Sequence, residues 1–184
     1  MMPNEAKFVN ELNTYKIHIS GFVKESIVDG FGLRYVIFTQ GCLHECLNCH
    51  NKHTWSLDGG YLMDTHDIIN DFDNYPLIEG ITLSGGEPFL QPIQCNQLAI
   101  EAHKKGLNVL VFSGYTYEEI LLRGSSALDL LKNCDYLIDG PYLDNFRTLD
   151  LAFRGSSNQR IIDLNKTREA QRLIVIDEFK NILL

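Results

Sequence analysis

The sequence of 184 residues is poor in positive charge and contains no long apolar segment. It has 16 Lys and Arg residues against 24 Asp and Glu residues, which gives a formal net charge of −8. Because nucleic-acid binding needs a concentrated basic surface that neutralises phosphates, this balance argues against DNA or RNA as a direct partner. No apolar run approaches the roughly 20 residues that cross a bilayer, and residues 1–15 lack the layout of a secretory signal. We therefore expect a cytoplasmic protein that does not enter a membrane.

The number and spacing of the cysteines argue against a disulfide framework. There are five cysteines, an odd number, and Cys42, Cys46 and Cys49 fall within eight residues. Three soft thiolates in the spacing C-x3-C-x2-C suit zinc or an iron–sulfur centre, so this loop is a predicted metal site. Cys95 and Cys134 fall at expected helical or helix-end positions, where a cysteine is more often a small buried apolar residue than a ligand.

Internal repeats and low-complexity segments are also absent, and the composition is that of an ordinary globular protein. The chain is 45% hydrophobic and 22% charged, and its length suits one domain with a sizeable core. Short apolar runs alternate with helical patterns, a rhythm that predicts βα units around a parallel sheet. The expected strands, rich in Ile, Val, Leu and Phe, are Lys16–Ser20, Arg34–Thr39, Gly80–Leu83, Asn108–Phe112, Tyr136–Ile138 and Leu173–Ile176.

Capping residues mark expected helices between these strands. Thr65 is expected to cap one helix, and Pro92 to open another. Thr116 and Glu119 have the spacing of a capping box, which predicts a helix over residues 118–123.

Four loops are expected to follow the carboxyl ends of strands, which is where parallel sheets build their sites. They cover residues 40–51, 84–88, 113–115 and 139–142. Because the carboxyl ends of parallel strands lie at one edge of a sheet, we expect these loops to meet.

The cysteine loop admits two kinds of metal site. In a 4Fe-4S cluster, three cysteines leave one iron without a protein ligand, and that iron is open to a chelating molecule. The alternative is a structural zinc site, in which His44, His50 or His53 supplies the fourth ligand of a closed tetrahedron. The glycine-rich acidic loop at residues 84–88 favours iron–sulfur, because a structural zinc site would not require it.

The C-x3-C-x2-C spacing resembles that of the radical S-adenosylmethionine superfamily. The resemblance implies that Cys42, Cys46 and Cys49 bind a 4Fe-4S cluster, whose open iron chelates the amino and carboxylate groups of S-adenosylmethionine. In this superfamily, one electron from the cluster breaks a carbon–sulfur bond and gives a 5′-deoxyadenosyl radical. The segment Ser84–Pro88 resembles the superfamily's GGE motif, which implies that its backbone and carboxylate hold the methionine ammonium group.

Two segments around the cysteines are similar to glycyl-radical activases. Residues 28–34 resemble their D-G-P-G-x-R entry, with Phe31 in place of the proline. Residues 49–55 resemble the C-x-N-x-x-T-W stretch shared by activators of pyruvate formate-lyase and of anaerobic ribonucleotide reductase. His50 is similar to the formate-lyase activators, since reductase activators usually carry an aromatic ring at this position.

The second half of the chain is similar to the reductase activators in particular, through Phe112–Tyr115, Leu137–Tyr142 and Arg154–Arg160. These segments imply that the partner is an anaerobic ribonucleoside-triphosphate reductase, one glycine of which loses a hydrogen atom. They also imply an electron donor such as flavodoxin or ferredoxin. The alternatives are an activator of a pyruvate formate-lyase-like enzyme, a small-molecule radical enzyme such as a deazaguanine-forming synthase, and a zinc-binding adaptor.

The resemblance also implies a set of site residues, with no catalytic residue beyond the ligands of the cluster and the cosubstrate. Arg154 and Asn158 are the expected contacts to the partner protein. The expected contacts to S-adenosylmethionine are Asn48, His50, Gly85, Gly86, Glu87, Ser113, Tyr115 and Asp139.

The length of the chain limits the expected architecture. A complete eight-unit barrel takes about 250 residues, so this chain can build about five or six units. We therefore expect an α/β fold with a mostly parallel sheet, in an open partial (β/α) barrel of the radical S-adenosylmethionine type, whose open side admits a glycine loop of another protein. We expect one domain over residues 1–184, with an N-terminal extension and first strand (1–27), a recognisable core (28–163), and a C-terminal strand and tail (164–184).

Overall fold

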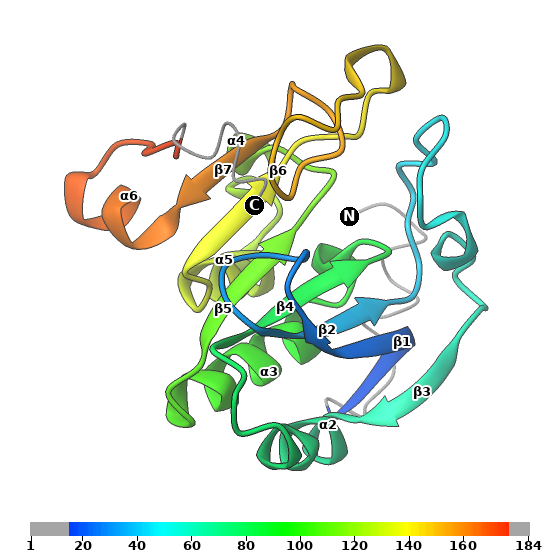
Figure 1. Ribbon diagram of the computed structural model, residues 1–184, viewed down its shortest axis with the longest axis vertical. Helices are drawn as coiled ribbons and strands as arrows, with labels where there is room; N and C mark the ends of the chain where they lie inside the picture. The colour runs from blue at the N-terminus through cyan, green and yellow to red at the C-terminus, as the bar shows by residue number, and fades with distance from the viewer. Residues whose placement is uncertain (1–14, 177–184) are drawn as a thin grey trace.

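Seven strands in the described part of the chain form one sheet, in the order β3-β1-β2-β4-β5-β6-β7 (Figure 1). The sheet belongs to a computed structural model, which describes residues 15–176. The expected extension before residue 15 and the tail after residue 176 lie outside the described residues. The strands are β1 (Lys16–Ser26), β2 (Arg34–Thr39), β3 (Tyr61–Asp64), β4 (Gly80–Gly85), β5 (Asn108–Phe112), β6 (Tyr136–Asp139) and β7 (Arg160–Asp163).

The centre of the sheet is parallel, and its two edges are antiparallel. β2, β4, β5 and β6 pair in parallel. β1 and β3 on one side, and β7 on the other, add antiparallel strands. β3 and β7 stand at opposite ends of the strand order and do not pair with each other, so the sheet does not close. The expected α/β class with an open partial barrel is confirmed.

Five of the six predicted strands begin at the predicted residue. The central strands are buried on both faces of the sheet, and such strands have continuous apolar runs in sequence. In β2, for example, Tyr35, Val36 and Ile37 are fully buried. This continuous apolar pattern made the central strands recognisable in the sequence.

The sixth predicted strand, Leu173–Ile176, is wrong. Its residues make one isolated bridge, between Val175 and Ile162, and two backbone hydrogen bonds to β7, too few to form a strand. The edge strand is instead β7. It was not predicted because its end residues, Arg160 and Asp163, are polar and leave an apolar run of two residues. β3 was not predicted either, because it has only four residues and half of them are exposed.

The helices of the described chain are short, and none is long and apolar enough to cross a membrane. The α-helices are α2 (Thr65–Asp71), α3 (Pro92–Lys104), α4 (Tyr117–Ile120), α5 (Ser125–Lys132) and α6 (Leu164–Ala170). Short 3₁₀ helices are η1 (Lys52–Thr54), η2 (Phe72–Asn74), η3 (Pro88–Leu90) and η4 (Asp144–Phe146).

The capping residues were predicted correctly for two helices and wrongly for one. Pro92 opens α3, and Thr116 with Glu119 forms the complete capping box of α4. The helix covers Tyr117–Ile120 and not the predicted residues 118–123. The cap of α2 is Asp64 and not Thr65, because the Asp64 carboxylate accepts a hydrogen bond from the His66 N–H. Aspartate ranks above threonine as an N-cap residue, so Asp64 was the better choice of the two neighbours.

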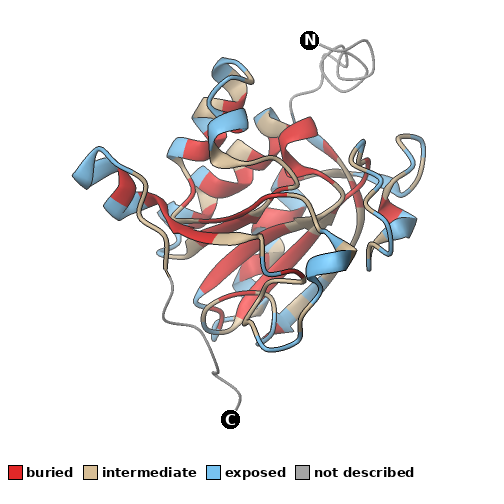
Figure 2. Cartoon of the chain, turned by 90° about the horizontal axis from the view of Figure 1, so that it is seen from above, coloured by how far each residue is buried: buried red, intermediate tan, exposed pale blue. Residues whose placement is uncertain are grey.

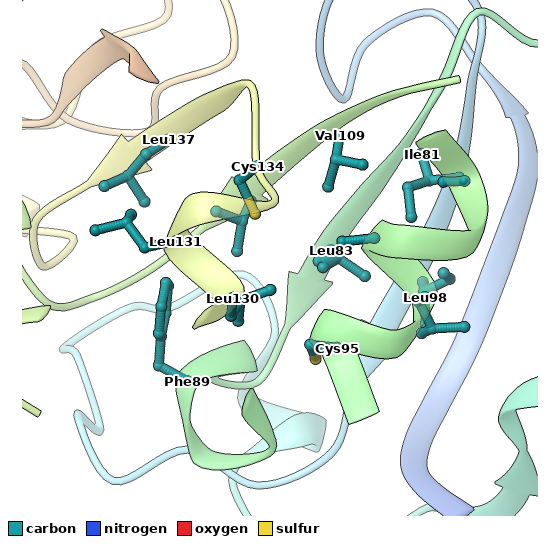
Figure 3. Close-up of a cluster of buried hydrophobic side chains, with 14 of the residues drawn as sticks. Ile81, Leu83, Phe89, Cys95, Leu98, Val109, Leu130, Leu131, Cys134 and Leu137 are labelled. Carbon is teal, nitrogen blue, oxygen red and sulfur yellow. The ribbon is translucent and has the colours of Figure 1, made fainter. Parts of the chain in front are cut away.

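The main core lies where helices cover one face of the sheet (Figure 1). Leu98 of α3 and Leu130 of α5 pack there against strand residues such as Leu83 (Figure 3). Cys95 and Cys134 are fully buried in the same cluster, as predicted, and burial raises the pKa of both thiols. The strands are buried along most of their length, whereas the outer sides of the helices are exposed (Figure 2).

The other face of the sheet is covered by loops. Leu110 and Ile138 point to this face and form a smaller cluster, since alternate residues of a strand face opposite sides. Phe31 and Phe153 pack on that cluster, with their ring centroids 5.2 Å apart. Phe31, which replaces the proline of the activase motif, therefore has a packing role on this face.

Candidate functional site

The four predicted loops meet at the carboxyl ends of β2, β4, β5 and β6 and line one pocket. A second hollow adjoins it and shares part of its wall, and Val28 and Asp29 form another part of that wall. The four loops contribute Cys42, His44, Cys46 and Cys49 to the first pocket, then Gly85, Gly86 and Glu87, then Ser113 and Gly114, and finally Gly140 and Tyr142.

The cysteine loop presents all three predicted ligand cysteines to this pocket. Cys42, Cys46 and Cys49 are half-buried and carry free thiols. The Cys42 N–H donates to the Trp55 carbonyl at 3.1 Å, and the Cys49 N–H donates to the Cys46 carbonyl at 3.0 Å. The start of the loop is therefore held by the segment that follows it, and its end is held by a hydrogen bond within the loop.

The environment of the cysteines fits an iron–sulfur cluster. Burial raises the pKa of the Cys42 thiol to about 12, and the negative charge of Glu87 adds to this effect. Burial also raises the pKa of Cys46. Because sulfur binds metals as the thiolate, the positive charge of bound iron would hold these groups deprotonated. The buried Trp55 indole N–H has no acceptor among the described residues, and an anionic sulfide cluster or a carboxylate could accept it.

Two of the three histidines considered for a zinc site have other side-chain contacts, and the third is exposed. The His44 ring is hydrogen-bonded to Glu87 at 3.1 Å, the His50 ring lies 5.6 Å from that of Tyr142, and His53 is exposed. In residues 15–176, no three His, Cys, Asp or Glu side chains are arranged to hold a single metal ion.

Gly85 and Gly86 allow the loop after β4 to pack closely against the cysteine loop and against β2. A Cβ atom on Gly86 would lie 2.3 Å from the Gly41 carbonyl oxygen, and one on Gly85 would lie 2.6 Å from the Phe38 Cα. Gly85 also has φ +94°, a conformation that favours glycine. The backbone of these glycines therefore lies close to the cysteine loop and to the strand before it.

Glu87 is the most connected side chain of the pocket. Its carboxylate, in a residue that is 1% exposed, accepts from the Phe89 N–H at 3.0 Å, the Gly114 N–H at 2.8 Å and the Ser113 hydroxyl at 3.0 and 3.1 Å. The His44 ring is the fourth partner, at 3.1 Å. Through His44 on one side and Ser113 and Gly114 on the other, Glu87 joins the cysteine loop to the loop after β5.

Two of the other predicted cosubstrate contacts line a cavity, and the remaining ones contact other parts of the protein. Ser113 lines the pocket, and His50 lines the adjoining hollow. Tyr115 packs its ring against His44, with centroids 4.3 Å apart. Asn48 is exposed and donates to Asp144 at 3.0 Å, which ties the cysteine loop to the loop after β6.

Asp139 is bound within the protein. It is 1% exposed and accepts from the Arg160 Nε at 3.0 Å and from the Tyr117 N–H at 2.7 Å. Arg160 also pairs with Glu118 at 2.7 Å, so the three side chains join β6, β7 and α4. These bonds raise the pKa of Arg160 further above its ordinary value.

Arg154 and Asn158, the predicted partner contacts, are half-buried in the loop before β7. The Asn158 amide donates to the Pro141 carbonyl at 2.8 Å, while Arg154 donates to the Gln159 carbonyl at 3.5 Å. Their observed hydrogen bonds therefore shape the loops that line the pocket.

Sequence reasoning gave no cluster or cosubstrate role to several residues of the pocket wall, among them His44, Trp55 and Gln159. Each of these three lies inside a segment that resembles the radical S-adenosylmethionine superfamily or its activases, close to residues with a predicted site role. Their position in these segments indicated that they lie near the site, but spacing along the chain does not show which side chains point into the pocket.

Comparison with known proteins gives a consistent set of relatives. The family described as a 4Fe-4S single cluster domain matches residues 28–162. The anaerobic ribonucleoside-triphosphate reductase-activating protein of Enterobacteria phage T4 is 36% identical over 141 residues, which cover 73% of this chain and 86% of the relative. The protein of the same name from Escherichia coli (strain K12) is 35% identical over 142 residues, 72% of this chain and 90% of the relative.

Two further comparisons are more distant in coverage or in structure. The pyruvate formate-lyase-activating enzyme of Staphylococcus epidermidis is 34% identical over 155 residues, 80% of this chain and 61% of that enzyme. The crystal structure of QueE from Escherichia coli aligns with a TM-score of 0.44 and 17% identity, over 63% of this chain and 58% of QueE. From the sequence matches, the chain belongs to the family of 4Fe-4S single-cluster proteins that includes the anaerobic ribonucleoside-triphosphate reductase-activating proteins.

Proposed function

We propose that this protein activates an anaerobic ribonucleoside-triphosphate reductase by generating a radical on one of its glycines. The observation that carries the proposal is that the three cysteines and the Gly85–Glu87 loop line one pocket together with segments similar to reductase activators. The named relatives support the same target, since two of them are activating proteins of this reductase.

The proposed roles follow from the position of each group. When bound, the cluster supplies the electron that cleaves S-adenosylmethionine to methionine and a 5′-deoxyadenosyl radical, which takes a hydrogen atom from the reductase glycine. Cys42, Cys46 and Cys49 hold the cluster, and the Gly85–Glu87 loop holds the methionine part of the cosubstrate. The proposal includes a cytoplasmic location and an electron donor such as flavodoxin or ferredoxin.

A second candidate is activation of a pyruvate formate-lyase-like enzyme. It is favoured by His50 beside the last cysteine and by the relative from Staphylococcus epidermidis. The reductase is preferred, because residues 139–142 and 154–160 both resemble its activators, and two separate loops outweigh one residue.

Radical transfer to the two candidate partners distinguishes these functions. The reconstituted protein is mixed anaerobically with S-adenosylmethionine, a reductant and either the reductase or a formate-lyase from the same organism. Electron paramagnetic resonance should show a glycyl radical on the reductase. A radical on the formate-lyase alone would overturn the preferred target.

Glu87→Gln is expected to weaken S-adenosylmethionine binding by about 30-fold or more while the cluster remains. The amide has one acceptor oxygen in place of two, and its NH₂ group would face N–H and O–H donors. It also removes the negative charge that would attract an ammonium group. Anaerobic equilibrium dialysis measures the affinity, and iron content reports the cluster.

Glu101→Gln is the matched control for this change. Glu101 lies on α3 and pairs with Lys104 at 2.7 Å at the protein surface, so the same chemical change there should leave the affinity unaltered. Equal affinity of Glu87→Gln and Glu101→Gln would reject the assigned role of Glu87.

A further inference from the structure

His44 lies between the first two ligand cysteines and is held by side-chain contacts. Among the described residues, no backbone-to-backbone hydrogen bond involves Leu43, His44 or Glu45. Glu45 has φ 46°, a left-handed conformation that is unfavourable for a residue with a side chain. The His44 N–H donates to the Cys42 thiol, which is a contact within the loop, so the anchor of this segment to the rest of the protein is a side chain.

The His44 ring is that anchor. It is hydrogen-bonded to Glu87 at 3.1 Å, and the two side chains are 18% and 1% exposed. The Phe89 N–H, the Gly114 N–H and the Ser113 hydroxyl donate to the same carboxylate, so we assign the donor role in this contact to the His44 Nε2. The ring meets Tyr115 edge-on at 4.3 Å, and a Cβ atom on Gly114 would lie 2.4 Å from its Cδ2. Gly114 thus leaves the space that the ring occupies.

We propose that His44 is a positioning residue, whose hydrogen bond to Glu87 fixes the cysteine loop relative to the loop that binds S-adenosylmethionine. This inference rests on the proposed function, since it assumes a cluster on one loop and the cosubstrate on the other. The hydrogen bond joins the segment between two cluster ligands to the carboxylate assigned to the cosubstrate. Its loss leaves a strained loop without its anchor and a buried carboxylate with one donor fewer.

Two substitutions separate the hydrogen bond from the packing of the ring. His44→Phe keeps an aromatic ring beside Tyr115 and Gly114 but removes the donor to Glu87. His44→Gln loses the ring but keeps an N–H donor. We expect S-adenosylmethionine to bind His44→Phe about tenfold or more weakly than the parent protein, equivalent to about 1.4 kcal/mol. His44→Gln should bind within about threefold of the parent.

The measurements are anaerobic equilibrium dialysis, iron and sulfide per chain, and the electron paramagnetic resonance spectrum of the reduced cluster with and without S-adenosylmethionine. The spectral change on addition of the cosubstrate should be reduced in His44→Phe and retained in His44→Gln. Loss of iron from His44→Phe but not from His44→Gln would also support the proposal, because the hydrogen bond would then position the cysteines themselves.

Gly114→Ala provides a test that leaves His44 unchanged. The added methyl group displaces the ring, while the main-chain N–H that donates to Glu87 is kept, so binding should weaken as in His44→Phe. Parent-like affinity of His44→Phe, or equal weakening in His44→Phe and His44→Gln, would overturn the proposal. Failure of the parent protein to bind S-adenosylmethionine or form a glycyl radical would instead count against the proposed function.

Discussion

Replacing any one of Cys42, Cys46 or Cys49 by alanine is expected to abolish the iron–sulfur cluster. In the proposed site each cysteine supplies the protein ligand of one iron, so no ligand is redundant. The only other cysteines, Cys95 and Cys134, are fully buried in the core between the helices and the sheet (Figure 3). They cannot replace a missing ligand without unfolding of that core.

Iron and sulfide content, visible absorption and electron paramagnetic resonance after anaerobic reconstitution measure this loss. Cys95→Ala is the matched control and should retain the iron and sulfide of the parent protein. A Cys134→Ala protein that loses the cluster while Cys46→Ala keeps it would contradict the assignment. Zinc without iron or sulfide in the anaerobically purified parent would favour the zinc-binding adaptor instead.

The central strands and the loops that follow them could be predicted from sequence, because both have local signals. A parallel strand buried on both faces has an apolar run, as in β2 and β5. A loop with three cysteines or two adjacent glycines departs from the surrounding pattern. Topology then brings such loops together without further information, since parallel strands end at one edge of the sheet.

The edges of the sheet could not be predicted in the same way. β7 begins with Arg160, and its pairing with β6 is accompanied by the ion pair between Arg160 and Asp139. An isolated arginine in a sequence gives no sign of a carboxylate 21 residues away. For Leu173–Ile176 the apolar run was present, but strand formation depends on a partner ladder, and only one bridge formed.

The hydrogen-bond partners of polar side chains could not be predicted from the sequence either. Asp139, Arg154 and Asn158 were recognised as parts of specific segments, and the structure shows each bonded to neighbouring loops or strands. His44 received only the role of a possible zinc ligand, although its ring contacts Glu87. Residue type predicts the chemistry that a side chain can perform, whereas its partner depends on contacts distant in sequence.

Arg34→Met is expected to lower the free energy of unfolding by about 3 kcal/mol or more, because it leaves several buried acceptors without a donor at about 1 to 3 kcal/mol each. Arg34 is fully buried. Within the described chain it makes no salt bridge, yet all five of its N–H groups have acceptors. These are the Thr82 hydroxyl at 2.8 Å, the Asn108 side-chain oxygen at 2.5 Å, and the carbonyls of Phe31, Ile81 and Asn108.

Burial lowers the pKa of Arg34 to about 10, so the side chain remains charged at neutral pH. The planar fork of arginine supplies five donors, whereas lysine supplies three. Arg34→Lys should therefore recover only part of the lost stability. Urea unfolding, followed by circular dichroism under anaerobic conditions, measures this loss. The free energy of unfolding falls by about 1 to 3 kcal/mol per M of urea, so the urea midpoint of Arg34→Met should be lower by about 1 to 3 M.

Lys132→Met is the control. The Lys132 side chain is 71% exposed, and substitutions at such surface positions usually change the free energy of unfolding by no more than about 0.5 kcal/mol. The same midpoint for Arg34→Met and Lys132→Met would contradict the prediction. Full recovery in Arg34→Lys would show that the charge of Arg34 matters and that its planar set of five donors does not.

The hydrogen bonds of Arg34 also extend to the site. Its acceptor Thr82 donates to the Asp29 carbonyl at 2.8 Å, and Asp29 lines the hollow beside Cys49. Loss of this buried cation should therefore loosen the wall of the site as well as the fold.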